Sequence, residues 1–166
     1  MTDALLPQDI DDLAEKVIAA NRDAKRTVAL AESCTGGLVA AALTEVPGSS
    51  AVLDRGFVTY SNEAKMEMLG VPSDIIETFG AVSIACVWAM AQGALEKSGA
   101  DVAVAISGVA GPGGGTVTKP VGTVVFARAI RNSEGEPEGE LKKFGDLGRA
   151  EIRRQATLCA LELLLP

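Results

Sequence analysis

Apolar and polar positions along the chain form two kinds of block. Short, almost wholly apolar runs predict buried strands, and longer segments with apolar residues three or four positions apart predict helices. Strands are expected at residues 27–31, 56–60, 101–106 and 121–130 and near 141–144, and helices at 13–18, 35–46, 62–69, 73–78, 83–97 and 152–164. The polar, glycine-containing segment 131–140 is expected to be a hairpin turn.

The order of these elements defines the fold class. Strand, helix and strand alternate in the first part of the chain, and a strand pair lies near its end. This order predicts an α/β protein, a three-layer α/β/α sandwich on a mixed, mostly parallel five-stranded sheet. Its length of 166 residues, with 48% hydrophobic and 22% charged residues, fits a single domain over residues 1–166.

Composition narrows the possible functions. The net charge of −7 argues against a nucleic-acid partner, because a negative surface repels phosphate backbones. The chain contains no histidine, which excludes Ser-His-Asp and Cys-His catalysis and every histidine-containing metal site, and no metal is expected. Cys34, Cys86 and Cys159 lie far apart and are expected to be reduced thiols. No signal peptide and no apolar run of about 20 residues is found, so we expect a cytoplasmic protein that does not enter the membrane.

Three unusual segments directly follow predicted strands, at residues 31–37, 60–65 and 107–115. In open α/β sheets ligands bind at the carboxyl ends of the parallel strands. Because neighbouring strands lie only about 5 Å apart, the three segments are expected to form one pocket.

The first segment offers a nucleophile. Ser33 lies where a strand becomes a helix, and the amides near Cys34, Thr35 and Gly36 are placed to hold an anion or an oxyanion. The alternative is that Ser33 or Thr35 only caps the helix. Cys34 is a second possible nucleophile, although without histidine a packed free thiol is the simpler interpretation.

Lys65, in the second segment, is the candidate base. If Asn62 caps the next helix, Lys65 lies in the first turn, where the helix dipole and partial burial both lower an amine pKa. A neutral amine then accepts a proton. The alternative is a solvated surface lysine. Tyr60 is expected to hydrogen-bond Lys65 or to orient the substrate.

The third segment is rich in glycine. Around Ser107, Gly108, Gly111 and Gly113 the backbone is bare enough for a phosphate or a ring to approach closely, but no Walker or Rossmann fingerprint is present. A flexible loop is the alternative. Arg149, just after Gly148 at the start of the last helix, is the best candidate for a phosphate clamp, whereas the neighbouring Arg153 and Arg154 are free to project into water.

Several segments together resemble the C-terminal domain of the CinA competence/damage-inducible proteins. They are Ala31 to Gly37, Tyr60-Ser61-Asn62 with Lys65, Gly80-Ala81-Val82-Ser83, Ile106-Ser107-Gly108 with Gly111-Pro112, and Lys119-Pro120-Val121-Gly122-Thr123. The resemblance covers roughly residues 13–164. It implies a three-layer α/β/α amidohydrolase that needs no metal or cofactor and forms a homodimer.

The resemblance also implies a reaction. It points to conversion of nicotinamide mononucleotide and water to nicotinate mononucleotide and ammonia by a serine-lysine dyad, here Ser33 and Lys65. Ser50 is a second possible nucleophile, although an intervening strand should place it at the other end of the sheet. Candidate substrate contacts are Cys34, Thr35, Gly36, Ser50, Ser107, Gly108, Gly111, Gly113 and Arg149. A non-catalytic pyridine-nucleotide-binding module, or an amidase for another small amide, remains the alternative.

Overall fold

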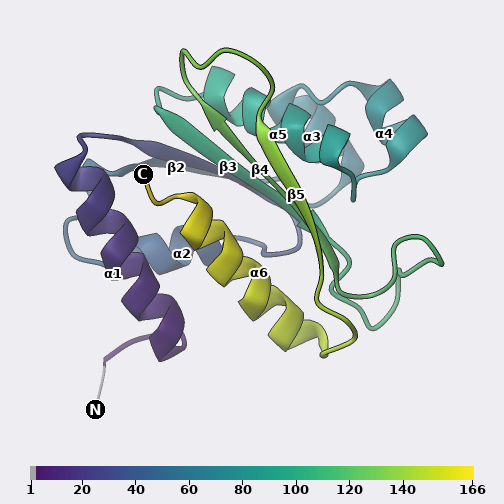
Figure 1. Ribbon diagram of the computed structural model, residues 1–166, viewed down its shortest axis with the longest axis horizontal. Helices are drawn as coiled ribbons and strands as arrows, with labels where there is room; N and C mark the ends of the chain where they lie inside the picture. The colour runs from purple at the N-terminus through teal and green to yellow at the C-terminus, as the bar shows by residue number, and fades with distance from the viewer. Residues whose placement is uncertain (1–2) are drawn as a thin grey trace.

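A computed structural model of the chain, described over residues 3–166, contains one mixed five-stranded sheet (Figure 1). The strand order is β2-β1-β3-β4-β5; β2, β1 and β3 are parallel, and β4 and β5 are antiparallel to their neighbours. The strands are β1 (Val28–Glu32), β2 (Leu53–Val58), β3 (Val102–Gly108), β4 (Thr123–Ile130) and β5 (Glu138–Lys143). The predicted mixed α/β architecture is therefore confirmed.

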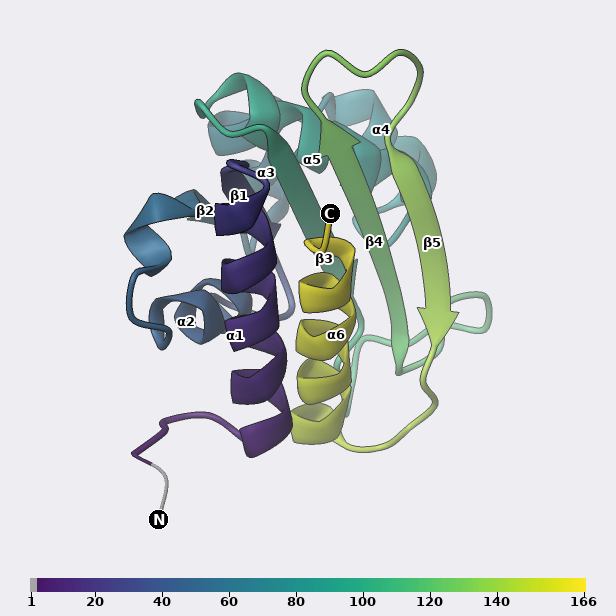
Figure 2. The same ribbon diagram turned by 60° about the vertical axis from the view of Figure 1, so that its left-hand side comes forward.

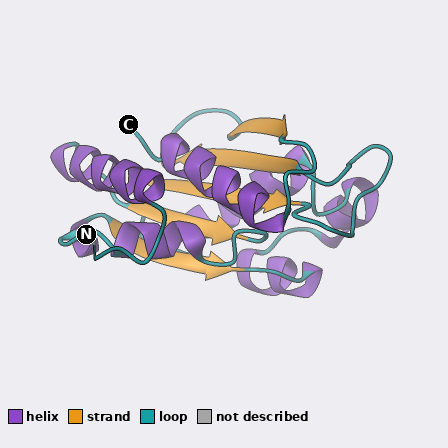
Figure 3. Ribbon diagram, turned by 90° about the horizontal axis from the view of Figure 1, so that it is seen from below, coloured by secondary structure: helices purple, strands orange, loops and turns teal. Residues whose placement is uncertain are grey.

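Helices cover both faces of the sheet and complete the three layers (Figure 3). One face carries α1, α2 and α6, and the other carries α3, α4 and α5. The bounds are α1 (Gln8–Asp23), α2 (Leu38–Thr44), α3 (Asn62–Leu69), α4 (Ser73–Phe79), α5 (Ile84–Glu96) and α6 (Arg149–Leu163), with a short 3-10 helix η1 (Ser49–Ala51) before β2.

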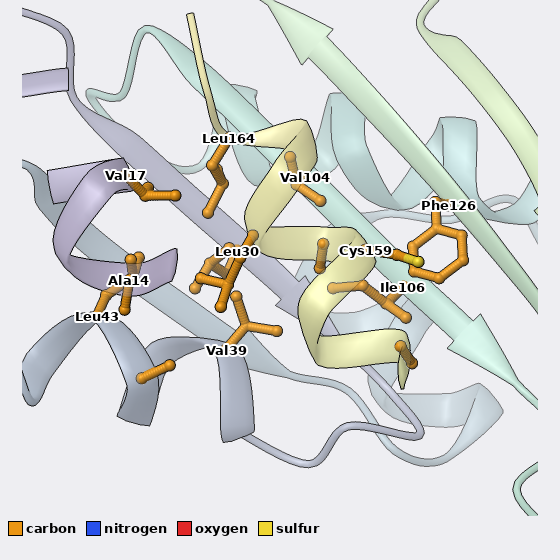
Figure 4. Packing of buried hydrophobic residues seen from close by; sticks show 14 of the residues in the cluster. Ala14, Val17, Leu30, Val39, Leu43, Val104, Ile106, Phe126, Cys159 and Leu164 are labelled. Carbon is orange, nitrogen blue, oxygen red and sulfur yellow. The ribbon is translucent and has the colours of Figure 1, made fainter. Parts of the chain in front are cut away.

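Side-chain size differs between the two faces of the central strands. Leu30, Val104 and Ile106 point toward α1, α2 and α6 (Figure 4), whereas alternate residues such as Ala103 and Ala105 face α5. The alternation follows from the two-residue period of a strand. Small side chains on the α5 face leave room for that helix to pack close to the sheet, so the predicted central strand, covered on both sides, is confirmed.

The last helix is fixed against the first. Figure 2 shows α1 and α6 side by side over the sheet, and the buried Asn21 donates to the carbonyl of Leu164 at 2.9 Å. The opposite end of α6 reaches the carboxyl end of β1, where Arg153 contacts the carbonyl of Cys34. The packing of α6 thus brings its first residues to the edge where the three predicted segments meet.

Two predicted boundaries are wrong in ways that affect the site. The strand expected at 56–60 is β2, which ends at Val58 and leaves Tyr60 in a loop. The helix expected from residue 35 begins only at Leu38, because Gly36 and Gly37 adopt φ values of +58° and +104°, which belong to the left-handed region. Among residues 3–166, no helix is long and apolar enough to cross a bilayer.

Candidate active site

A pocket of about 270 Å³ opens at the carboxyl ends of β1, β2 and β3. All three predicted segments contribute to it, so their convergence is confirmed. Its lining residues are Ser33, Cys34, Tyr60, Asn62, Lys65, Ala81, Val82, Ser107, Gly108, Ala110 and Arg149.

The pocket contains a direct contact between Lys65 and Ser33. The amine Nζ lies 2.9 Å from Ser33 Oγ, 2.8 Å from the carbonyl oxygen of Thr59 and 3.2 Å from that of Tyr60. Lys65 is only 1% exposed and Ser33 only 7%. The alternative of a solvated surface lysine is therefore wrong.

The surroundings of Lys65 favour its neutral form. Burial lowers its pKa below the ordinary value of 10.5, and none of the ion pairs within residues 3–166 includes it. A neutral amine has two N–H groups and one lone pair. Because the carbonyls of Thr59 and Tyr60 can only accept, they take the two N–H groups and leave the lone pair for the hydroxyl of Ser33.

The N-cap of the helix that carries Lys65 lies one residue before the predicted cap. Ser61, not Asn62, is the N-cap of α3, and its Oγ accepts the N–H of Ala64 at 3.0 Å. Lys65 still lies in the first turn, where the helix dipole disfavours a positive charge. Asn62 instead lines the pocket, a role that the sequence analysis missed.

The turn between β1 and α2 is held by a buried carboxylate. Glu32, 1% exposed, accepts the N–H groups of Gly37, Val39 and Ala40 at 3.0–3.2 Å. The alternative interpretation, in which Ser33 or Thr35 only caps this helix, is therefore wrong. Glu32 already satisfies the start of α2, so this helix end is not available for a substrate anion.

Two backbone N–H groups of the turn remain open. The N–H of Gly36 is used by the carbonyl of Ser33 at 3.0 Å, but those of Cys34 and Thr35 have no acceptor within the described residues. The predicted oxyanion donors are thus reduced to Cys34 and Thr35. Burial raises the pKa of the Cys34 thiol to about 11, which fits a packed thiol rather than a nucleophile.

Tyr60 and Arg149 form the rim of the pocket. Tyr60 contacts Lys65 through its main-chain carbonyl, while its hydroxyl accepts from Arg149 Nη2 at 3.2 Å. Arg149 also donates to the carbonyl of Gly111 at 2.6 Å, and its side chain is exposed. The rim therefore carries one cation with donors directed to the third segment.

The next two arginines of α6 do not both project into water. Arg153 donates to the carbonyl of Cys34 at 3.0 Å and approaches that of Thr35 at 3.5 Å. Arg154 pairs with Asp9 and Glu151. The expectation of solvent-directed side chains is wrong for Arg153.

Some predicted substrate contacts lie outside the pocket. Ser50 is in η1, before the start of β2, at the amino end of the parallel strands. Gly113 is exposed and Gly111 is buried, and neither lines the pocket; the turn borders the cavity through Ser33 and Cys34, while the side chain of Thr35 and the residue Gly36 do not line it. Within one copy of the chain, the prediction that Ser50, Gly36, Gly111 and Gly113 line the pocket is therefore wrong.

Apolar pocket residues were also missed. Ala81 and Val82, between α4 and α5, and Ala110, after β3, line the cavity. The first two belong to the Gly80-Ala81-Val82-Ser83 segment, which was quoted in the resemblance but given no role. They supply an apolar wall suited to the face of a ring.

No other region of residues 3–166 offers comparable chemistry. No group of three or more His, Cys, Asp or Glu side chains that could hold a metal ion occurs there. A second hollow, of about 230 Å³, lies beneath the β4–β5 hairpin. Its Arg131 is committed to the carbonyls of Leu95, Ser98 and Ala100.

Fold and site together define a class of protein: a three-layer α/β protein in which a buried lysine amine contacts a serine hydroxyl at the carboxyl ends of the parallel strands. The family model described as the CinA C-terminal domain matches residues 10–166. The chain belongs to this family.

Known relatives fall into two length groups. A "CinA-like protein" of Akkermansia muciniphila is 60% identical over 137 residues, which is 82% of this chain and 32% of that protein. The chain thus spans about a third of that longer relative. In contrast, the "Nicotinamide-nucleotide amidohydrolase PncC" of Escherichia coli K12 is 51% identical over 164 residues, which is 99% of this chain and 95% of that protein.

The fold is also that of a solved structure. The crystal structure of the competence/damage inducible protein CihA from Agrobacterium tumefaciens superposes with a TM-score of 0.93 at 52% identity, covering 97% of this chain and 96% of that one.

Proposed function

We propose that this protein is an amidohydrolase that converts nicotinamide mononucleotide and water to nicotinate mononucleotide and ammonia. The observation that carries the proposal is the 2.9 Å contact between Lys65 Nζ and Ser33 Oγ, with the other two contacts of the amine made by carbonyls. The near-full-length similarity to the E. coli protein named for this activity supports the choice of substrate.

The first half of the reaction transfers the acyl group to serine. Neutral Lys65 takes the hydroxyl proton of Ser33, and Oγ attacks the carboxamide carbon. The free N–H groups of Cys34 and Thr35 hold the oxygen as it becomes negative. Protonated Lys65 then gives its proton to the leaving nitrogen, and ammonia departs.

The second half returns the enzyme to its starting state. Lys65, neutral again, takes a proton from water, which attacks the ester carbon on Ser33. Lys65 then returns the proton to Oγ as the bond to the acyl group breaks. The product leaves as the carboxylic acid, which ionises to the carboxylate by giving its proton to the released ammonia or to water, and Ser33 and Lys65 are back in their starting protonation states.

The remainder of the substrate is assigned to the walls and rim. A cavity of about 270 Å³ is near the lower end of ordinary small-molecule pockets, about 300 Å³, so it suits the ring and carboxamide better than the whole nucleotide. We place the pyridine ring against Ala81 and Val82, and the ribose and phosphate toward Ser107 and Arg149. The N–H groups of Arg149 that are used neither by the carbonyl of Gly111 nor by the hydroxyl of Tyr60 are the donors for phosphate.

Two further properties belong to this proposal. We expect the enzyme to act in the cytoplasm, where pyridine mononucleotides are turned over. We also expect a homodimer, as the family resemblance implies.

The test follows both products. Purified protein is mixed with nicotinamide mononucleotide, and ammonia and nicotinate mononucleotide are measured together. The unaltered chain and Ser133→Ala, which changes an exposed hairpin serine, should form both products in equal amounts, and Ser33→Ala should form almost none. Full turnover by Ser33→Ala would reject the nucleophile. Tight binding by the unaltered chain without ammonia would favour a binding module instead.

A further inference from the structure

The two open N–H groups of the nucleophile turn belong to successive peptide groups. In each peptide the carbonyl and N–H are coplanar and point in opposite directions, so fixing the oxygen also fixes the N–H. The Ser33–Cys34 peptide is fixed within the turn, because the carbonyl of Ser33 accepts the N–H of Gly36 at 3.0 Å. The N–H of Cys34 is thereby oriented by the turn itself.

The second peptide depends on a distant residue. The carbonyl of Cys34 accepts from Arg153 Nε at 3.0 Å, across 119 residues of chain. The same guanidinium approaches the carbonyl of Thr35 at 3.5 Å, and its Nη2 lies 3.4 Å from where a Cβ on Gly36 would be. Within residues 3–166, Arg153 is therefore the one group that fixes the peptide carrying the N–H of Thr35.

The charge of Arg153 is also uncommitted. It takes part in no ion pair within residues 3–166, whereas its neighbour Arg154 is paired with Asp9 and Glu151. Its guanidinium therefore contacts the carbonyls of the turn without a direct carboxylate partner. A hydrogen bond from a cation to a carbonyl also makes the N–H of the same peptide a stronger donor.

We propose that Arg153 is the positioning residue of the oxyanion hole: it holds the Cys34–Thr35 peptide so that the N–H of Thr35 meets the carboxamide oxygen as it becomes negative. This inference rests on the amidohydrolase function proposed above. Arg153 does not line the pocket, so it acts through the turn and does not touch the substrate.

The proposal predicts a particular kinetic signature. In Arg153→Gln the Cys34–Thr35 peptide loses its fixed orientation and the nearby charge. An interaction made in the transition state alone lowers kcat and leaves KM almost unchanged. Removing a complete oxyanion donor typically lowers kcat about a hundredfold to a thousandfold. Loosening one of the two N–H donors without removing it should therefore lower kcat about tenfold to a hundredfold.

The adjacent arginine provides the matched control. Arg154→Gln removes the same charge from the same helix, but Arg154 contacts neither the turn nor the pocket. We expect its kcat and KM to stay within about twofold of the unaltered protein. Arg153→Lys keeps the charge and one donor and should recover part of the lost kcat.

The experiment measures kcat and KM for nicotinamide mononucleotide across pH in the unaltered chain and the three variants, with circular dichroism to check folding. The inference holds if Arg153→Gln has a lower kcat and an unchanged KM. The pH at which its kcat levels off should also be unchanged, because that pH is set by the pKa of Lys65. The inference is overturned by a kcat within twofold of the unaltered chain, by an equal loss in Arg154→Gln, or by a rise in KM alone.

A separate readout covers the case in which Arg153→Gln does not fold. Arg153→Lys, which retains the aliphatic stem, is then used instead. Its affinity is measured for the product and for an aldehyde analogue of the substrate. The aldehyde adds to Ser33 and places a negative oxygen in the oxyanion hole. The inference is supported if Arg153→Lys binds the aldehyde more weakly than the unaltered chain does but binds the product equally well. It is overturned if the affinity for the aldehyde is unchanged, or falls no more than the affinity for the product. Absence of ammonia release in the unaltered chain would reject the proposed function instead.

Discussion

Replacing Lys65 with methionine removes the amine but keeps an unbranched side chain in the buried space that Lys65 occupies. In the proposed mechanism the hydroxyl of Ser33 then has no base. The chain has no histidine, and the carboxylate of Glu32 is committed to three backbone N–H groups. Only water remains to accept the proton.

The magnitude follows from the loss of one positioned base. General-base catalysis contributes about a hundredfold to ten-thousandfold, or about 3–5 kcal/mol at about 1.36 kcal/mol per factor of ten. We therefore expect Lys65→Met to lose at least about a hundredfold in kcat. The loss should fall on kcat because the amine is held by Ser33 and two carbonyls rather than directed at the rim.

The assay is ammonia release under saturating substrate, on protein shown by circular dichroism to be folded. Lys143→Met, at an exposed position on β5, removes a lysine elsewhere and should retain full activity. Lys65→Ala opens a cavity, and added methylamine or ethylamine should partly restore its rate. A folded Lys65→Met protein with more than about a tenth of the original kcat would refute the role of the amine as base.

Three other outcomes follow from the structure. Because the pKa of Lys65 is lowered by burial and only its neutral form accepts a proton, kcat should rise tenfold per pH unit and level off below pH 10.5; a kcat that falls with rising pH contradicts this. Because burial raises the pKa of Cys34 to about 11, iodoacetamide should alkylate it at least about tenfold more slowly at neutral pH in the folded chain than in urea, as followed by peptide mass; equal rates would show an accessible thiolate. Gly93→Ala would place its Cβ 2.0 Å from the carbonyl oxygen of Leu69 and should lower the free energy of unfolding in urea by about 1–3 kcal/mol, despite the better helix propensity of alanine. The control is Gly99→Ala, because nothing lies within 4 Å of a Cβ at that position. Equal stabilities of the two variants would refute the close packing at Gly93.

The parts of the site that sequence could predict are those set by strand periodicity. The alternation around Val104 identifies a central strand, and the ends of β1 and β2 bring Ser33 and Lys65 to one edge. Parallel strands end at the same edge whatever side chains lie beyond them. The same argument places Ser50 at the other end, as the structure does.

The parts that sequence could not predict depend on the conformation of one turn and on tertiary packing. Glu32 reaches the amides of α2 because two glycines in the left-handed region fold the chain back over it. Arg153 faces inward because α6 packs beside α1, and no local pattern distinguishes it from Arg154. The cap of α3 differs by one residue from the prediction because Ser61 and Asn62 are both good capping residues.

The long-range contact of Arg153 has a consequence for how the protein matures during synthesis. Ser33 and Lys65 leave the ribosome early, but the brace on the turn between β1 and α2 arrives only with α6, 119 residues after Cys34. Contacts so distant in sequence form late, because the intervening chain must first close its loop. On the proposed mechanism, a nascent chain would therefore contain Ser33 and Lys65 before its oxyanion site is complete, and catalytic competence would appear only when α6 docks.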